Sequence, residues 1–159
     1  MQENLLEQIA FMFTHPPLLF GGKALERYRL RKGNDTDWIL SAADFQAMHQ
    51  TFPESYFTNA YGDEGIRLGQ HEFYRSCFGY TYDLLIAQAQ QCHQYLVASP
   101  LVLLYLKIAT ALHETNNQKA WQDIRLLTRY LCSRFDGLNE GPANSILGQP
   151  TSEKKMEEA

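Results

Sequence analysis

The chain has no excess of basic charge, no cysteine framework and no long apolar run. Its 159 residues carry a formal net charge of −4, so no global basic field attracts nucleic acid, and an RNA or DNA partner would need a local patch. Cys77, Cys92 and Cys132 are odd in number, widely spaced and without a Cys-x-x-Cys pair, which argues against a disulfide framework and a zinc site. The absence of bilayer-length apolar runs and of a basic N-terminal region predicts a cytoplasmic protein that does not enter a membrane.

Several familiar catalytic patterns are also missing. The chain has no Walker-type phosphate loop, and its five histidines do not have the spacing of zinc ligands. Spacing alone also supports no Ser-His-Asp or Cys-His arrangement. At this length we expect a single domain over residues 1–136, followed by a flexible tail at 137–159 that is rich in polar residues, glycine and proline.

One stretch near the N-terminus combines glycines with carboxylates. Residues 18–20 are predicted to form a short apolar strand, Gly21-Gly22 a turn that opens a helix over 23–30, and residues 36–40 a second strand. Asp35 and Asp37 stand on alternate positions, so both side chains point to one face of that strand. Two adjacent carboxylates repel unless a hard cation such as Mg²⁺ binds both, and this predicts a metal site. Glycine beside a helix N-terminus favours an approaching phosphate.

The rest of the chain mixes helical and strand patterns. We expect a helix over residues 3–14, strands within 56–82, a helix at 86–94 and a strand at 95–97. Ser99-Pro100 should open a long helix, and a last helix should follow Asn116-Asn117. The apolar stripe expected to be buried on the long helix consists of Leu101, Leu104, Tyr105, Ile108 and Leu112.

These residues resemble a known family. Twelve residues separate Gly22 from Asp35, and a double-glycine turn at that distance from an Asp-x-Asp resembles the DNA polymerase β-like nucleotidyltransferase superfamily, in particular its small bacterial minimal and abortive-infection-type members. Leu106-Lys107-Ile108-Ala109 followed by residues 119–124 (Lys-Ala-Trp-Gln-Asp-Ile) resembles the C-terminal helices of those proteins, with Ala120 where aspartate is usual. The resemblance covers roughly residues 18–131.

The resemblance implies a fold and a site. The fold would be α+β, a nucleotidyltransferase-like mixed β-sheet flanked by helices with a helical pair at 100–135. Asp35 and Asp37 would bind two Mg²⁺ ions, and Asp83, placed late on a central strand, would be the third carboxylate. The residues implied to contact the nucleotide are Gly21, Gly22, Lys23 and Lys107.

The implied activity is transfer of a nucleoside monophosphate from an NTP to an acceptor hydroxyl, with Asp83 taking the proton. The acceptor could be a small molecule, a tRNA or a protein side chain. Three alternatives stay open. The chain could be a non-catalytic nucleotide-binding or toxin–antitoxin-type module that works with a partner protein or as a homodimer. It could be a glycosyltransferase whose Asp-x-Asp binds a metal–nucleotide sugar, or an α+β interaction protein with coincidental aspartates.

Overall fold

The protein is a mixed α+β domain, as the sequence predicts. The computed structural model describes residues 5–139, with side chains up to residue 135. The helices are α1 (Gly21–Arg27), α2 (Ala42–Thr51), α3 (Tyr82–Leu85), α4 (Pro100–His113) and α5 (Gln118–Asn139), with a 3₁₀ turn η1 (Pro53–Ser55). The strands are β1 (Leu18–Phe20), β2 (Thr36–Ile39), β3 (Tyr56–Thr58), β4 (Glu64–Leu68), β5 (His71–Tyr74), β6 (Ser76–Cys77), β7 (Tyr80–Thr81), β8 (Gln90–Cys92) and β9 (Tyr95–Val97).

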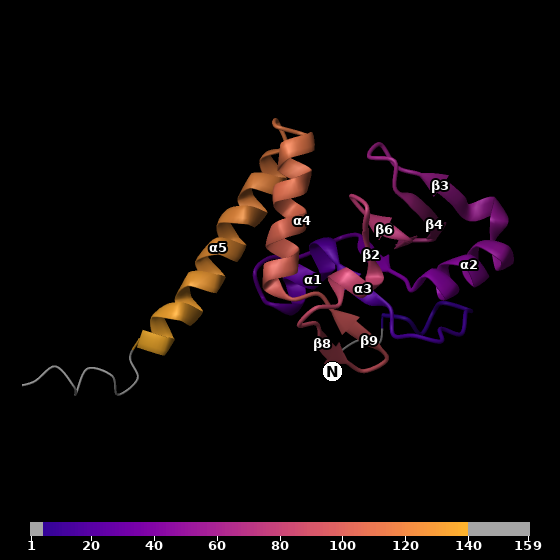
Figure 1. The fold of residues 1–159 in the computed structure, drawn as a ribbon, viewed down its shortest axis with the longest axis horizontal. Coiled ribbons are helices and arrows are strands. Elements are labelled where there is room, and N and C mark those ends of the chain that lie inside the picture. Colours follow the sequence, from indigo (N-terminus) through magenta and orange to yellow (C-terminus); the bar gives the residue numbers. More distant parts are fainter. Residues whose placement is uncertain (1–4, 140–159) are drawn as a thin grey trace, which may run out of the picture.

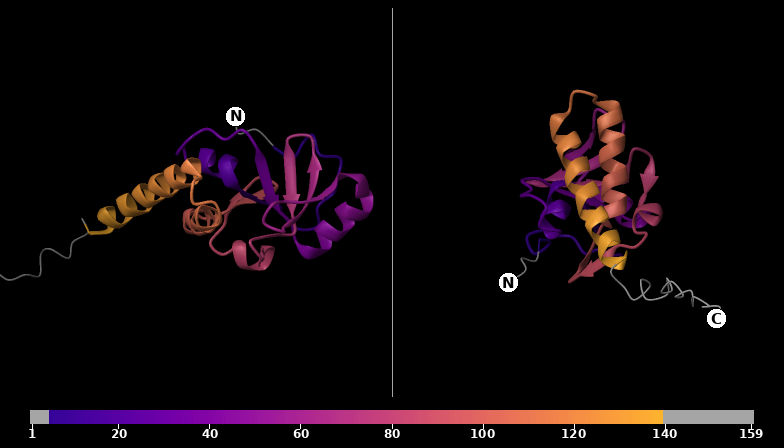
Figure 2. Two further views of the ribbon diagram at one scale, coloured as in Figure 1. Left: turned by 90° about the horizontal axis from the view of Figure 1, so that it is seen from above. Right: turned by 90° about the vertical axis from the view of Figure 1, so that its left-hand side faces the viewer.

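A seven-stranded mixed sheet in the order β3-β4-β5-β2-β1-β9-β8 forms the centre of the fold. β1 pairs antiparallel with β2 and parallel with β9, whereas β2 pairs parallel with β5. The short strands β6 and β7 form a separate hairpin. Helices α4 and α5 lie side by side at one end of the sheet, and α2 lies at the other end (Figures 1 and 2). Within residues 5–139, no helix is both long enough and apolar enough to cross a membrane.

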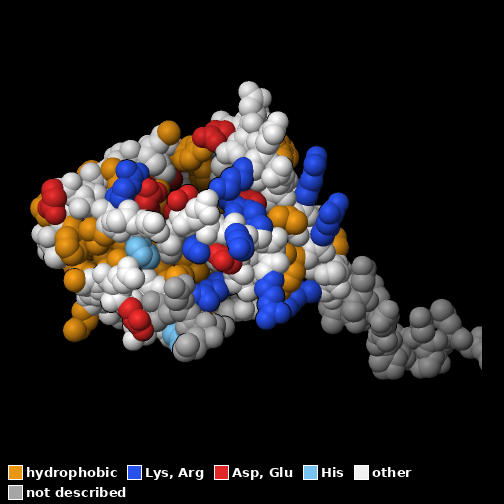
Figure 3. Space-filling view, turned by 180° about the vertical axis from the view of Figure 1, so that it is seen from behind, with side chains coloured by type: hydrophobic (Ala, Val, Ile, Leu, Met, Phe, Trp, Pro, Cys, Tyr) orange, Lys and Arg blue, Asp and Glu red, His pale blue; other side chains and the backbone are white. Residues whose placement is uncertain are grey.

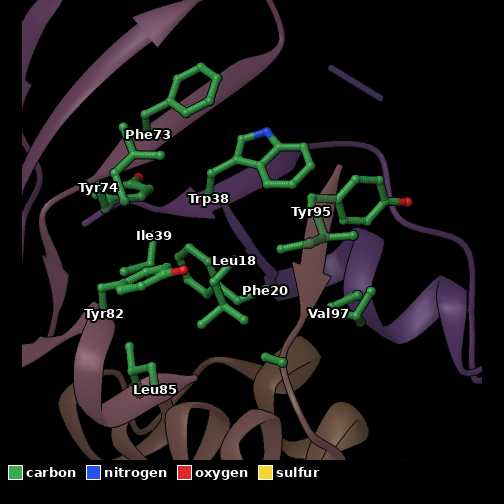
Figure 4. Close-up of a cluster of buried hydrophobic side chains, with 14 of the residues drawn as sticks. Leu18, Phe20, Trp38, Ile39, Phe73, Tyr74, Tyr82, Leu85, Tyr95 and Val97 are labelled. Carbon is green, nitrogen blue, oxygen red and sulfur yellow. The ribbon is translucent and has the colours of Figure 1, made fainter. Parts of the chain in front are cut away.

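The core is built on the central strands. Trp38 of β2 is fully buried, with Phe73 stacked beside it and the ring of Tyr95 edge-on against it (Figure 4). The Trp38 indole N–H points to Nδ1 of His71 at 3.1 Å, so the polar atom of this buried ring has a partner. This packing fixes β2 between β1 and β5 and therefore fixes the positions of the residues around Asp37.

The predicted helix start at Ser99 is confirmed, and α2 begins in the same way at Ser41. The Ser41 hydroxyl accepts a hydrogen bond from the backbone N–H of Asp44, and that of Ser99 accepts one from Val102. Such caps satisfy backbone donors that a first helical turn leaves free. Strand β1 has the predicted bounds, while α1 begins two residues before the predicted helix and ends three residues sooner.

Three predictions of secondary structure are wrong. Within the expected helix at 3–14, the described residues from 5 onward form a turn and then an irregular segment. The segment at 86–94 contains strand β8 and no helix. Asp83 does not end a strand but lies in the short helix α3. In each case the apolar spacing fitted a local pattern, and pairing with distant strands and loops decided the structure.

The stripe expected to be buried on α4 is also placed wrongly. The buried residues of this helix are Leu103, Leu106 and Ala111, while most of the predicted stripe is exposed. Because α4 is apolar on nearly all sides, its sequence does not indicate which side faces the sheet. The last helix, α5, continues to Asn139, three residues into the predicted tail, and the rest of that tail, residues 140–159, lies outside the described residues.

A buried carboxylate ties the irregular N-terminal segment to α2. Asp44 is 2% exposed and accepts hydrogen bonds from Thr14 N and Oγ1 at 2.8 Å, His15 N at 2.9 Å and Ser41 Oγ at 2.9 Å. Burial alone would raise the pKa of Asp44, but the hydrogen bonds from Thr14, His15 and Ser41 lower it below its usual value. Thr14 and His15, at the end of the segment predicted as a helix, are therefore held by the Asp44 carboxylate.

Replacing this carboxylate should destabilise the fold. Asp44→Ala should lower the free energy of unfolding by about 2–3 kcal/mol at pH 7, because it removes the shared acceptor of four partly buried hydrogen bonds. The difference should shrink as the pH falls below about 3.9, where the aspartate of the unfolded chain takes up its proton, and it should vanish only at a lower pH, because the folded carboxylate has a lowered pKa. Urea denaturation at pH 7 and pH 3.5 measures both effects, and an unchanged stability at pH 7 would contradict the anchoring role.

Candidate functional site

The β1–α1 turn brings the backbone against a carboxylate of β2. Phe20 and Asp37 are paired residues of the antiparallel β1–β2 ladder, and Gly21 follows with φ +67°. A Cβ atom at Gly21 would collide with Oδ2 of Asp37. Only glycine combines this backbone conformation with this approach without strain. The predicted closeness of the glycine turn and the Asp-x-Asp is therefore present for Gly21 and Asp37.

Asp37 lies among other acidic groups. In the parallel β2–β5 ladder its partner is Glu72, and exposed Asp35 immediately precedes Thr36, the first residue of β2. Burial raises the pKa of Asp37 to about 6, and the negative charges of Glu72 and then Asp35 contribute, while Lys107 opposes the shift. A carboxylate held in this way gains from any cation that approaches it.

A cavity of about 170 Å³ opens beside Asp37. It lies between the sheet, the loop before β4, the β6–β7 hairpin and the inner side of α4. Three of the predicted site residues, Gly21, Asp37 and Lys107, line it. The other lining residues are Phe20, Asn59, Tyr61, Asp63, Tyr74, Cys77, Phe78, Leu103, Leu106 and Thr110.

Lys107 is held by a buried carboxylate on the neighbouring helix. Its Nζ lies 2.9 Å from Oδ2 of Asp123, which is fully buried in α5. Arg31, from the loop after α1, approaches the same carboxylate with Nε at 2.5 Å and Nη2 at 2.7 Å. Burial would raise the pKa of Asp123, but the hydrogen bonds and charges of Arg31 and Lys107 lower it. Two cations on one buried carboxylate leave a net positive charge beside the cavity.

The family resemblance did not identify Asp123 or Arg31 as residues next to the site. Asp123 belongs to the Lys-Ala-Trp-Gln-Asp-Ile segment. The sequence signal for a buried ion pair was a single acidic residue among the apolar positions of the inward side of that helix. The partner of such a residue lies 92 positions away at Arg31, so spacing along the chain could not identify it. A lysine in an apolar run must either extend its ammonium group to solvent or meet a carboxylate, and Lys107 meets Asp123.

The second glycine and the first lysine have other surroundings. Gly22 packs against Gly33, where an added Cβ would collide with the Gly22 backbone. Lys23 Nζ lies 2.9 Å from Oε2 of Glu26 within α1, and Lys23 does not line the cavity. Gly22 therefore sets the approach of the loop before β2 to α1, and Lys23 is in an ion pair next to the site.

Asp83 is not at this site. It is exposed on α3, it is not among the residues that line the cavity, and its charge is not among the influences on Asp37. Glu72 is the third acidic residue next to the Asp-x-Asp pair. The sequence signal for Glu72 was a carboxylate inside a strand of otherwise large side chains, His71-Glu72-Phe73-Tyr74. Its parallel pairing with β2 connects segments that are distant along the chain, so it needed the tertiary structure.

The carboxylate of Glu72 already has two partners. Its Oε1 accepts from Arg67 Nε at 2.7 Å, and its Oε2 accepts from the Tyr74 hydroxyl at 2.5 Å. Among the residues that the structure describes, no group of three or more His, Cys, Asp or Glu side chains stands ready to hold a metal ion. Binding of a cation by Glu72 would require Arg67, whose side chain is exposed, to move away.

Basic side chains gather around acidic ones on one face of the molecule. Figure 3, the view from behind, shows Lys and Arg side chains around a few Asp and Glu side chains, in contrast to the net charge of −4 of the whole chain. Residues 23–32 alone supply five basic residues. A local field of this kind attracts phosphate groups although the protein as a whole does not.

The raised pKa of Asp37 predicts a pH-dependent gain in stability when its charge is removed. An unfolded aspartate titrates near pH 3.9 and the folded one at about 6, so the wild type loses stability as the pH rises between these values. Asp37→Asn should raise the free energy of unfolding by about 3 kcal/mol at pH 8 and leave it unchanged at pH 3.5. Urea denaturation at the two pH values tests this, with the exposed Asp83→Asn as the matched control. Equal stabilities of wild type and Asp37→Asn at pH 8 would contradict it.

The chain was compared with models of known protein families and with curated proteins. No family model matches it, and no curated protein matches it. The evidence on function is therefore the arrangement of the side chains: a carboxylate against a glycine turn, two further acidic residues beside it, and a lysine held by a buried aspartate.

Proposed function

We propose that the protein is a metal-dependent nucleotidyltransferase with a nucleotidyltransferase-like fold, and that the cavity beside Asp37 is its active site. The observation that carries the proposal is that Gly21, Asp37 and Lys107, from three separate elements, line one cavity. A glycine turn at the cavity, a carboxylate whose ionised form an approaching cation would stabilise, and a positively charged group together suit a metal-bound triphosphate.

The residues that would hold Mg²⁺ are Asp35 and Asp37, with Glu72 as the third carboxylate in place of Asp83. The fit rests on Asp37, whose pKa is raised by burial first and then by the negative charges of Glu72 and Asp35, and a divalent cation would relieve that repulsion. Bound Mg²⁺ would neutralise charge on the triphosphate and favour the leaving of pyrophosphate.

The reaction joins an acceptor hydroxyl to the α-phosphorus of the NTP. The new P–O bond forms as the bond to the bridging oxygen of the β-phosphate breaks, and pyrophosphate leaves. The proton of the hydroxyl goes to a site carboxylate, a role that we transfer from Asp83 to Glu72. Gly21 allows the phosphates to come close to the backbone, and Lys107 stabilises their negative charge.

The role of Lys107 depends on its partner. Asp123 holds the lysine stem on the cavity side of α4, and because Arg31 shares that carboxylate, Lys107 keeps part of its charge for a ligand. Asp123 is a positioning residue in this proposal, since it acts on the substrate only through Lys107.

The direct test is turnover of labelled nucleotides. Wild-type protein with Mg²⁺ and each of ATP, GTP, CTP and UTP, in the presence of cell RNA or protein as acceptor, should release pyrophosphate. Asp37→Asn should lower the rate at least about 100-fold because a ligand and its charge are lost, and Glu72→Gln should lower it strongly. Asp83→Asn, matched in chemistry, should keep the wild-type rate. Pyrophosphate release that survives Asp37→Asn would refute the proposal.

Lys107→Met should weaken nucleotide binding while the protein stays folded, because Asp123 keeps its bidentate pair with Arg31. We expect the KM for the NTP to rise at least about tenfold. Lys23→Met is the matched control, since Lys23 pairs with Glu26 outside the cavity lining, and its KM should change by less than about threefold. Equal effects of the two substitutions would contradict the placement of the triphosphate beside α4.

A nucleotide-binding module without turnover is the second candidate. It is favoured by the hydrogen bonds that Arg67 and Tyr74 donate to Glu72, because these bonds already occupy both oxygens of the third carboxylate. Calorimetry separates the two functions: NTP binding in Mg²⁺ without pyrophosphate release, unchanged by Glu72→Gln, would establish the module.

A further inference from the structure

The outer side of α4 is apolar and open to solvent. Of its fourteen residues only Lys107 is Lys, Arg, Asp or Glu, and its ammonium group turns to Asp123. On the outer side the side chains are 59% exposed at Leu101, 49% at Tyr105, 40% at Ile108 and 71% at Leu112. A helix that is hydrophobic all round is normally covered on all sides, so this face should have a partner.

The four side chains form one narrow stripe. They follow at steps of four, three and four residues, and with 3.6 residues per turn they fall within about 60° of one another. This is the spacing of the seam in helix pairs that pack side by side. Seen from above, α4 stands end-on at the margin of the molecule, beside α3 and α5 (Figure 2). A second helix can therefore reach the stripe.

We propose that the stripe is the centre of a homodimer interface, in which α4 packs antiparallel against α4 of a second copy. The spacing of the stripe supports this pairing. Its steps of four, three and four residues are the same from either end, so the stripe matches a second copy of itself that runs in the opposite direction. A two-fold axis midway along the stripe sets Leu101 opposite the partner's Leu112 and Tyr105 opposite the partner's Ile108. Both pairs occur twice, as a symmetric dimer requires.

The absence of charge on the stripe supports a second copy as the occupant. The stripe carries no charge, so two identical faces meet without repulsion, whereas the protein as a whole has a charge of −4. Four side chains do not by themselves reach the roughly 800 Å² per partner of a standard interface. The flanks can add to it: Tyr80 of the β6–β7 hairpin contacts Tyr105, and α3, beside α4 in Figures 1 and 2, carries the exposed Leu84.

This dimer leaves the cavity open. The residues of α4 that line the cavity, Leu103, Leu106, Lys107 and Thr110, lie on the opposite side of the helix from the stripe. The inference is therefore independent of the proposed function and holds for an enzyme or a binding module. It also gives a reason for the all-round apolar character of α4, from which the buried side of the helix could not be predicted.

The oligomeric state in solution is the first test. Sedimentation velocity of the full chain should show a dimer with a Kd on the order of micromolar. Leu101→Glu and Leu112→Lys, each at an exposed position, should keep the circular dichroism and thermal midpoint of the wild type and raise the Kd at least about tenfold. Met12→Glu, an exposed apolar residue outside α4, is the control and should stay dimeric.

The second test fixes the direction of pairing. In a mixture of Leu101→Glu and Leu112→Lys proteins, an antiparallel dimer places the two new charges opposite each other and keeps the second Leu101–Leu112 contact. The mixture should therefore form heterodimers at concentrations where each variant alone is monomeric. A wild-type monomer up to about 200 µM would overturn the proposal, in favour of another occupant such as residues 140–159 or a different protein. A dimer that both substitutions leave intact, or a mixture without heterodimers, would overturn it as well.

Discussion

The arrangement of the site depends on the contact between the Gly21 backbone and the Asp37 carboxylate. The antiparallel pairing of β1 with β2 brings these residues together, and the positive φ of Gly21 lets the chain turn into α1 without a side chain in the way. Asp37 is thereby half-buried beside the turn, with Glu72 as its neighbour on β5, and this partial burial together with the charge of Glu72 raises its pKa. The cavity lies beside this contact, with α4 on its other side.

A second buried carboxylate, Asp123, connects the helical pair to the rest of the domain. It binds Arg31 from the loop that leads to β2 and Lys107 from α4, so three segments meet at one fully buried group. Loss of Arg31, which pairs with both oxygens of Asp123, would leave a buried charge poorly compensated, which is costly. The same pairing puts the Lys107 ammonium at the cavity, and the orientation of α4 that follows leaves its apolar outer side to solvent. The candidate site and the proposed dimer face are thus two sides of one helix.

Much of the local structure followed from short-range chemistry. The bounds of β1, the serine caps of α2 and α4 and the glycine turn were predictable because steric limits, capping and side-chain alternation act within a few residues. The closeness of Gly21 and Asp37 was predictable for the same reason, since one short helix joins the two strands. The α+β class also followed from the mixture of patterns. Residues 5–14 and 86–94 were not predictable, because Asp44 and strand β9 supply partners from outside those segments.

The sequence alone determined which functional groups could form a site: paired carboxylates, a glycine turn and a lysine in an apolar run, with no cysteine or histidine spacing typical of a metal site. The tertiary structure decided which of these groups meet. It brought Glu72 beside Asp37, left Asp83 exposed on α3, and gave Lys107 a partner in Asp123. The physical reason is that strand pairing and burial act between segments that are distant along the chain, where spacing carries no information. For α4, apolar on both sides, only packing against the sheet could select the buried face.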